Sequence, residues 1–288
     1  MSGPVEIVEM GPRDGLQNEA RLIPAAEKIA LVDALSGVGF RRIEVTSFVS
    51  PRWVPQMGDA AEVMAGITRR AGVGYMALTP NLKGYEAARA AGADWIAVFA
   101  SASEGFSRAN LNCSISESLE RFAPIMAAAH ADGVQVRGYV SVVTDCPFEG
   151  HVSPRQVTRV AQALHEMGCA EIALGETLGR GRPEAIAAML DAVGQAVPVA
   201  ALAAHFHDTS GRALENVDVA LEAGVRVFDA AVGGLGGCPY APGAAGNLAT
   251  ERLAAHLRGR GFDTGLDEAR LAEVAEMAAG LKQGEVRA

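Results

Sequence analysis

Short apolar or alternating runs recur about every 30 residues along this chain, and Ala- and Leu-rich helical patterns lie between them. Eight of these runs have the length and residue types of β-strands. Most of the helical stretches end at a glycine shortly before the next run, where a left-handed residue commonly terminates a helix. The predicted strands are residues 5–10, 41–48, 74–79, 95–101, 135–143, 171–177, 201–207 and 225–232.

Eight strand–helix units in 288 residues predict a (β/α)8 TIM barrel, a fold that typically takes ~250 residues. The alternative is an open doubly wound sheet, which is disfavoured because no GxGxxG-type turn follows the first strand. Residues 266–282 predict one extra amphipathic helix outside the barrel. No linker or low-complexity tract is visible, so we expect a single domain over residues 1–288.

Composition excludes several classes of function. The net charge is -9 without a basic cluster, so we expect no nucleic-acid partner. The four cysteines lie far apart and form no CxxC pair, which argues against a disulfide scaffold or a zinc cluster. No apolar run approaches the ~20 residues of a membrane span. The first residues do not resemble a secretory signal, so we expect a cytoplasmic protein without a membrane partner.

The sequence HFHD follows an apolar run, at the carboxyl end of the seventh predicted strand. Because side chains alternate along a strand, His205 and His207 should point to one face, about 7 Å apart, and Phe206 to the other. A lone core histidine is usually structural. A same-face pair at the end of a barrel strand instead predicts half of a divalent-metal site.

The first predicted strand leads directly into GPRDG, which contains Arg13 and Asp14. Taken alone, this motif also fits a simple turn, since Pro, Asp and Gly favour turns. Arg13 nevertheless places a fork of donors beside a hard oxygen ligand. Asp14 and the two histidines would form a site of mixed nitrogen and oxygen ligands, which favours Mg²⁺ or Mn²⁺ over structural zinc.

Two glutamates fall within or at the end of apolar predicted strands. Glu44 lies inside the second strand and Glu176 near the end of the sixth. A buried carboxylate must be paired or face a polar cavity. We therefore expect either an ion pair with Arg13 or Arg137, or a direct catalytic role, and the two are compatible.

The segment GLGGCPYAPGAAGN, residues 234–247, follows the eighth strand and carries Cys238. Its glycines and prolines predict a loop rather than a helix or strand. An inert connection with a buried thiol is one interpretation. The other is a lid over the barrel mouth that delivers Cys238 as a proton donor. Asn247 would then cap the following helix or turn its amide oxygen to a metal.

GPRDGLQNE, IEVTSFVSPRWVPQMGD, LTPNLKGYEAA, HFHDTSGRALEN and GLGGCPYAPGAAGN together resemble the 3-hydroxy-3-methylglutaryl-CoA lyases. This family belongs to a larger group of metal-dependent barrel lyases and synthases. The resemblance extends from Val5 to about His256 in the family's order and spacing. The cysteine segment and the SFVSPRWVPQMGD run are specific to the lyases, whereas HxHD is shared with the wider group.

The resemblance implies retro-Claisen cleavage of an acyl-CoA substrate to acetyl-CoA and acetoacetate, with Mg²⁺ or Mn²⁺ and in a homodimer. In this reading Arg13 steadies the enolate, and Cys238 protonates it. The matching positions are Arg13, Asp14, Glu44, Glu176 and Cys238 for catalysis; Asp14, His205, His207 and Asn247 for the metal; and Gln17, Thr177, Gly236 and Gly237 for substrate contact and the lid.

Some residues depart from the family pattern. Glu176 stands where the lyases usually have aspartate, and Phe206 and Ser210 stand where cysteine or alanine and tyrosine are common. A lyase for a related 3-hydroxy-3-substituted acyl-CoA is therefore a live alternative. A Claisen-type synthase of the same group is disfavoured by the cysteine segment, and a non-catalytic acyl-CoA-binding barrel by the intact polar residues.

Overall fold

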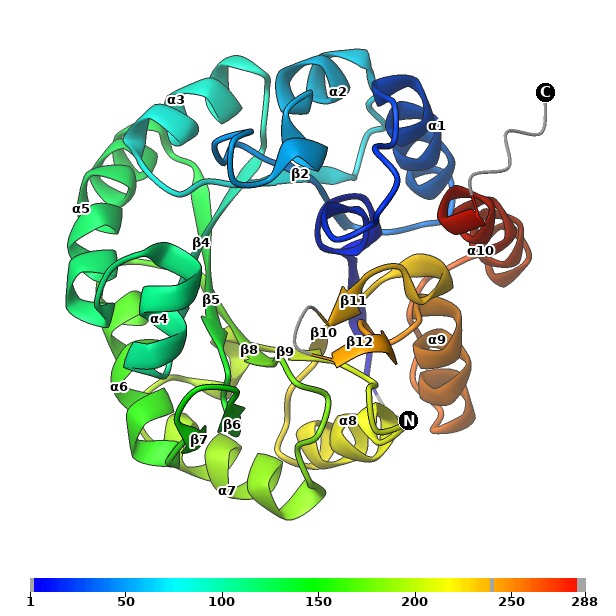
Figure 1. Ribbon diagram of the computed structural model, residues 1–288. Coiled ribbons are helices and arrows are strands. Elements are labelled where there is room, and N and C mark those ends of the chain that lie inside the picture. Colours follow the sequence, from blue (N-terminus) through cyan, green and yellow to red (C-terminus); the bar gives the residue numbers. More distant parts are fainter. Residues whose placement is uncertain (1–2, 239–240, 284–288) are drawn as a thin grey trace.

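The computed structural model describes residues 3–238 and 241–283. Eight parallel strands close into a barrel in the order β1-β10-β9-β8-β5-β4-β3-β2, and β1 pairs with β2 to complete the ring (Figure 1). The predicted (β/α)8 barrel is confirmed, and each predicted strand contains one barrel strand. They are β1 (Glu6–Glu9), β2 (Arg42–Ser47), β3 (Gly74–Leu78), β4 (Trp95–Ser101), β5 (Gln135–Ser141), β8 (Glu171–Glu176), β9 (Leu202–Phe206) and β10 (Val227–Ala230).

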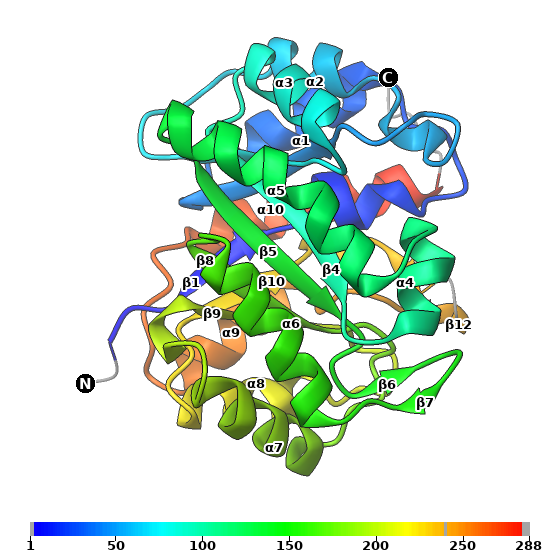
Figure 2. The same cartoon turned by 90° about the vertical axis from the view of Figure 1, so that its left-hand side faces the viewer.

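Helices surround the barrel and cover the outer face of the sheet (Figures 1 and 2). The extra C-terminal helix is confirmed as α10, which packs beside α1 and α9. The helix before α5 is an additional element that the sequence did not predict. The helices are α1 (Ala25–Ser36), α2 (Ala60–Gly66), α3 (Leu82–Ala90), α4 (Glu104–Leu111), α5 (Ile115–Asp132), α6 (Pro154–Glu166), α7 (Pro183–Gly194), α8 (Ala213–Glu222), α9 (Thr250–Gly259) and α10 (Glu268–Gln283).

Local sequence sets where the longer helices begin and end. Before α5, the Ser114 hydroxyl accepts from the Glu117 amide, and the Glu117 carboxylate accepts from the Ser114 amide. Ser153 and Gln156 form the same reciprocal pair before α6. Gly133 ends α5 with φ 67°, a left-handed conformation that glycine adopts without steric cost. Caps of this kind satisfy backbone groups that a helix end leaves without partners.

Two apolar layers hold the barrel together. The larger layer fills the space between the strands and the surrounding helices. The smaller one lies inside the barrel and consists of Val8, Met10, Met76, Leu78, Ala97, Tyr139, Ala173 and Ala203. The side chains that face the barrel interior also include charged groups, so this interior is only partly apolar.

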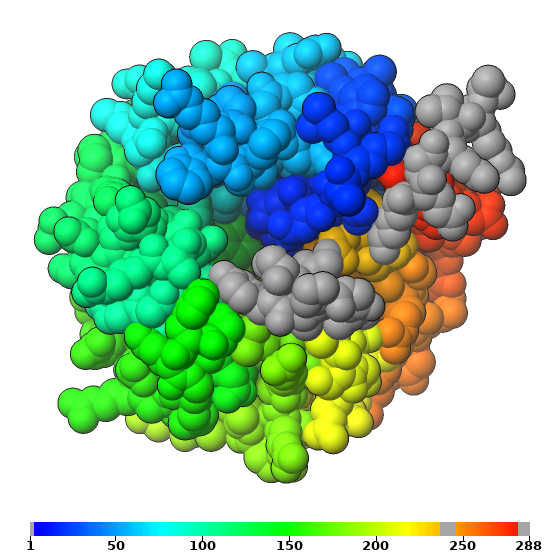
Figure 3. Space-filling view, viewed as in Figure 1, coloured from blue at the N-terminus to red at the C-terminus, as the bar shows by residue number. Residues whose placement is uncertain are grey.

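Short elements cover the carboxyl ends of the strands, which face the viewer in Figure 1 and lie to the right in Figure 2. A hollow opens at the centre of this face (Figure 3). The loop predicted over residues 234–247 was wrong in part, because β11 and β12 within it pair as antiparallel strands. The elements are η1 (Gly11–Gly15), η2 (Pro55–Met57), β6 (Asp145–Cys146) with β7 (Gly150–His151), η4 (Val232–Gly234), and β11 (Gly237–Cys238) with β12 (Ala241–Ala245).

At the opposite end of the barrel, the short η3 (Val199–Ala201) leads into β9. Within the described residues, no helix combines the length and apolar character that crossing a membrane requires.

Candidate active site

The turn η1 presents Arg13 and Asp14 at the mouth of the barrel. The amides of Arg13, Asp14 and Gly15 all donate to the Met10 carbonyl, so the chain winds tightly as it leaves β1. A Cβ on Gly15 would lie 2.6 Å from the Leu235 Cβ, closer than carbon atoms pack. Glycine is therefore required there, because the segment leading to β11 lies directly against the turn.

Asp14, His205 and His207 form a compact cluster. One ligand atom from each lies within 4.8 Å of the other two. The His205 Nε2 atom is 3.8 Å from Asp14 Oδ2, and the two imidazole centroids are 5.4 Å apart. The neighbouring Phe206 is buried in the layer between strands and helices. The alternation predicted for HFH is thus present, and it directs both imidazoles to the carboxylate.

Two of the three groups in this cluster, Asp14 and His207, have protonation states that suit a cation. Burial opposes ionisation of Asp14, but the Arg13 guanidinium and the two imidazoles outweigh it, so the pKa of Asp14 lies well below its usual range. Burial and the neighbouring His205 lower the pKa of His207 to about 4. Asp14 is therefore an anion and His207 a neutral base near neutral pH, the forms in which both bind a metal.

One buried atom of the cluster has no partner. His207 Nδ1 is buried and makes no hydrogen bond within the described part of the chain. A buried polar atom of this kind normally has a partner, so its isolation fits a ligand that binds at the cluster. An anionic oxygen and two imidazole nitrogens form a donor set that divalent cations accept. The residues present therefore fit a divalent metal.

Arg13 is held between two carboxylates. Its Nε atom donates to Glu44 Oε2 over 2.5 Å, and its Nη1 atom donates to Asp14 Oδ1 over 2.6 Å. The ion pair between Arg13 and Glu44 expected from the sequence is therefore present. Tyr139 helps to hold the Glu44 carboxylate in place, since its hydroxyl donates to Glu44 Oε1 over 3.3 Å. Among the described residues, Arg13 Nη2 makes no hydrogen bond, which leaves that donor available at the mouth.

Of the two alternatives for Glu176, the ion pair is not formed, because Glu176 pairs with neither Arg13 nor Arg137. Its Oε1 atom accepts from the Thr144 hydroxyl over 3.2 Å. Its Oε2 atom is buried without a hydrogen-bond partner among the described residues. Burial raises the pKa of this carboxyl. A Cβ on Gly181 would lie only 2.7 Å from Glu176 Cγ, so the extra methylene of Glu176 fits because residue 181 is glycine.

Asn247 lies beside the cluster. Its Nδ2 atom donates to Asp14 Oδ2 over 2.7 Å and to the Leu235 carbonyl over 3.3 Å. It does not cap the following helix, because Ala249 is the N-cap residue of α9. Asn247 instead forms a backbone bridge with His207. Gly236 packs against Asn247. Its φ is 99°, and a Cβ at this position would lie only 3.0 Å from Asn247 Nδ2, so both the backbone conformation and the close contact favour glycine.

The remaining predicted residues occupy different parts of the mouth. Gln17 is half-buried just after η1. The Thr177 hydroxyl accepts from the Val142 amide over 2.9 Å, which joins the ends of β8 and β5. Gly237 and Cys238 form β11 and pair with β12, and the side chain of Cys238 lies outside the described residues.

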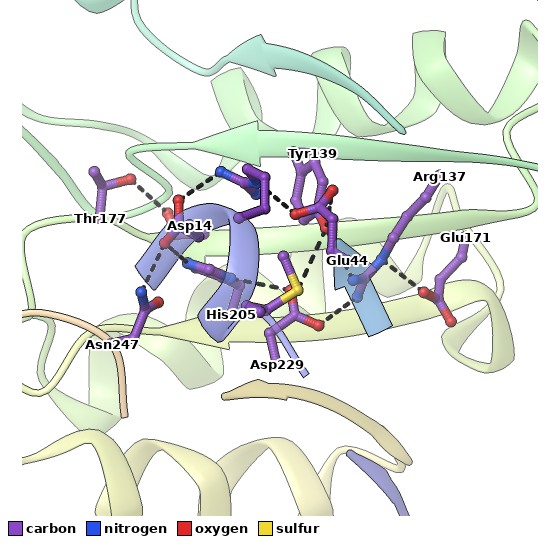
Figure 4. Close-up of polar contacts among 12 residues, drawn as sticks. Asp14, Glu44, Arg137, Tyr139, Glu171, Thr177, His205, Asp229 and Asn247 are labelled. Atoms are coloured by element: carbon purple, nitrogen blue, oxygen red, sulfur yellow. Dashed lines mark hydrogen bonds and ion pairs between the residues drawn. The ribbon is translucent and has the colours of Figure 1, made fainter. Parts of the chain in front are cut away.

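Three residues near the cluster were not among the predicted site residues, although Arg137 was considered as an ion-pair partner of the buried glutamates. Arg137, Tyr139 and Asp229 are buried inside the barrel, and in Figure 4 they lie to the right of Asp14 and Asn247. A sequence signal for two of them existed. Arg137 and Asp229 are charged residues within apolar strands, the same pattern that singled out Glu44.

The fold and the cluster together define the class of protein: a (β/α)8 barrel with a candidate divalent-metal centre at the carboxyl ends of its strands. The chain belongs to the HMGL-like family, whose model matches residues 4–278. The predicted family membership is thereby confirmed.

Several named proteins are similar to this chain over almost its full length. The mitochondrial hydroxymethylglutaryl-CoA lyase of Bos taurus is 57% identical over 93% of this chain and 83% of that protein. The 3-hydroxy-3-isohexenylglutaryl-CoA/hydroxy-methylglutaryl-CoA lyase of Pseudomonas aeruginosa is 56% identical over 91% of this chain and 88% of that protein. The crystal structure of the HMG-CoA lyase from Brucella melitensis superposes with a TM-score of 0.97 at 58% identity, covering 98% of this chain and 99% of that one.

Proposed function

We propose that this chain is a divalent-metal-dependent carbon–carbon lyase that cleaves 3-hydroxy-3-methylglutaryl-CoA to acetyl-CoA and acetoacetate. The observation that carries the proposal is the position of Arg13 directly beside the Asp14, His205 and His207 cluster, in a member of the HMGL-like family. The Arg13 guanidinium can donate hydrogen bonds to one part of the substrate while a divalent metal at the neighbouring cluster binds a substrate oxygen, and the reaction requires both.

The cation would be held by Asp14, His205 and His207, with Asn247 adjacent. When bound, Mg²⁺ or Mn²⁺ withdraws electron density from the C3 hydroxyl oxygen of the substrate and so lowers the pKa of that hydroxyl. Transfer of the hydroxyl proton to a general base lets a carbonyl form at C3 as the C2–C3 bond breaks. The bonding electrons then pass to the thioester as an enolate.

Arg13 stabilises this enolate. Its guanidinium is fixed by Glu44 and Asp14, so Nη2 is preorganised where the negative charge develops. A preorganised donor lowers the barrier because it does not have to reorient during the reaction. Glu44 acts through Arg13, and Tyr139 acts through Glu44.

The enolate carbon then needs one proton to become the methyl group of acetyl-CoA. We assign this proton to the Cys238 thiol, because Cys238 follows Gly236, which packs against both Asn247 and Gly15. The β11–β12 sheet is therefore connected to the metal cluster through Asn247, which follows β12, and it carries the proposed acid, Cys238, in β11.

A second candidate substrate is a 3-hydroxyglutaryl-CoA with a larger substituent at C3. Two observations favour testing it: the name of the Pseudomonas aeruginosa relative, and Glu176 at the position where the lyases usually have aspartate. Both substrates would give acetyl-CoA, and they differ in the second product.

A panel of 3-hydroxy-3-substituted acyl-CoAs tests the proposal. Purified protein with Mg²⁺ or Mn²⁺ is incubated with each member, and acetyl-CoA and the oxo-acid product are measured by mass spectrometry. We expect the highest kcat/KM for the 3-methyl compound, and release of acetyl-CoA from no member would contradict the proposal. Light scattering of the same preparation tests the homodimer that the family resemblance implies.

A further inference from the structure

We propose that Asp229 is a positioning residue for the metal cluster: it fixes the ring of His205 so that Nε2 faces Asp14, and Arg137 holds Asp229 in turn. This inference rests on the proposed metal site. It goes beyond that site because Asp229 and Arg137 are not among the proposed metal ligands, and neither makes a hydrogen bond or ion pair with Asp14.

Strand register places the two side chains together. Asp229 of β10 and His205 of β9 are direct partners in the parallel ladder, so their side chains project to the same face. His205 Nδ1 lies 3.0 Å from Asp229 Oδ2, and His205 Nε2 lies 3.8 Å from Asp14 Oδ2 (Figure 4). A proton on Nδ1 that is donated to Asp229 leaves the lone pair of Nε2 directed at the cluster.

Asp229 is itself held in place. Its other oxygen, Oδ1, accepts from Arg137 Nη2 over 2.7 Å, and both side chains are fully buried. Arg137 Nε lies 2.7 Å from Glu171 Oε1, and the Arg42 guanidinium donates to both Glu171 oxygens over 2.9 Å. Rotation of the Asp229 carboxylate would therefore break a buried ion pair, which is strongly unfavourable.

His207 provides an internal contrast. Within the described residues its imidazole makes no hydrogen bond to a carboxylate, so no contact of the kind that Asp229 makes with His205 orients its ring. The two imidazoles are thus supported differently although they stand two residues apart on one strand face. We assign the role of fixed ligand to His205, and this role depends on Asp229.

The test compares Asp229→Asn with Glu171→Gln as a matched control. Each variant removes one buried carboxylate charge beside Arg137, but only Asp229 contacts His205. Mn²⁺ affinity is measured without substrate by electron paramagnetic resonance, and circular dichroism checks that both variants fold. We expect Asp229→Asn to weaken Mn²⁺ binding by about 10- to 100-fold. Glu171→Gln should stay within about threefold of the wild type.

A second measurement is made on the wild-type protein and needs a variant only to assign one signal. Long-range ¹H–¹⁵N spectra of the imidazoles report which nitrogen carries the proton, with His205 assigned by its loss in a His205→Gln variant. At about pH 9, where imidazole is ordinarily neutral, we expect His205 to be protonated at Nδ1 both with and without Mg²⁺.

Three results would overturn the proposal: a His205 proton on Nε2, wild-type Mn²⁺ affinity in Asp229→Asn, or equal losses in the two variants. Because none of these measurements uses turnover, they are separate from a failure of the lyase proposal. A wild type that binds no Mn²⁺ would contradict the proposed function, and the imidazole spectra would then decide the role of Asp229 alone.

Discussion

Asn247 donates a hydrogen bond to Asp14 over 2.7 Å, and so joins the turn after the first strand to the segment that follows β12. The same amide group donates to the Leu235 carbonyl just before β11. The candidate metal cluster and the β11–β12 sheet are therefore connected through one side chain. A substitution at Asn247 should therefore change the metal affinity of the cluster even if Asn247 is not itself a ligand.

Replacing Asn247 with alanine removes this connection. We expect Asn247→Ala to weaken Mn²⁺ binding about tenfold, because Asp14 loses the donor that orients its carboxylate. Titration of Mn²⁺ without substrate measures the effect. Asn110→Ala, on the exposed surface of α4, is the control and should bind as the wild type does. Unchanged affinity in Asn247→Ala would show that the hydrogen bond does not support the site.

Arg13→Gln should lower kcat by about 10²- to 10³-fold with little change in KM, because the guanidinium acts on charge that develops only during the reaction. Steady-state kinetics with 3-hydroxy-3-methylglutaryl-CoA measures this. Arg69→Gln serves as the control, since Arg69 pairs with Asp94 at the surface and far from the mouth. A rise in KM with kcat unchanged would mean that Arg13 only binds substrate.

Cys238→Ala should reduce kcat by about 10²- to 10⁴-fold while Mn²⁺ affinity stays at the wild-type value, since the thiol is proposed as an acid and not as a ligand. Cys169→Ala is the matched control, because Cys169 is a buried thiol that precedes β8 at the opposite end of the barrel. If both variants turn over like the wild type, Cys238 is structural and the proton comes from another group.

Glu9 predicts a dependence of stability on pH. It is fully buried and accepts from the Gly11 and Val232 amides and the Thr250 hydroxyl. Burial raises its pKa from 4.5 to about 7. Between these values the folded chain holds a proton that the unfolded chain has lost. The contribution of Glu9 to the free energy of unfolding therefore falls as pH rises, by on the order of 3 kcal/mol in total.

Urea unfolding at about pH 5 and about pH 8 measures this contribution. In Glu9→Gln the loss is absent, so the variant should lose less stability than the wild type between the two pH values. Glu86→Gln removes an exposed carboxylate instead and should keep the wild-type difference. An identical pH difference in Glu9→Gln and the wild type would contradict the prediction.

The sequence predicted the barrel and the cluster because both depend on local patterns. Strand-length apolar runs and terminal glycines mark the repeating units, and the alternation of a strand directs His205 and His207 to one face. The position of GPRDG directly after the first strand then brings Asp14 to the same end, because strands of a parallel barrel share one carboxyl end.

Contacts that depend on strand register were not predictable in the same way. Asp229 meets His205 and Arg137 meets Glu171 because neighbouring strands align at those residues, and no local pattern encodes that alignment. For Glu176 the sequence left an ion pair and a catalytic role open for this reason, and in the structure its strand directs it to Thr144 instead of an arginine. The glycine-rich segment was predicted as a loop because a pairing partner, here β12, is not visible in local composition.

The most direct test of the central claim is the release of acetyl-CoA and acetoacetate from 3-hydroxy-3-methylglutaryl-CoA by protein stripped with a chelator, before and after metal is added. We predict no release above background from the stripped protein and full recovery at one Mg²⁺ or Mn²⁺ per Asp14–His205–His207 cluster. Undiminished release by the stripped protein would contradict the assignment of this cluster as the metal centre of a lyase.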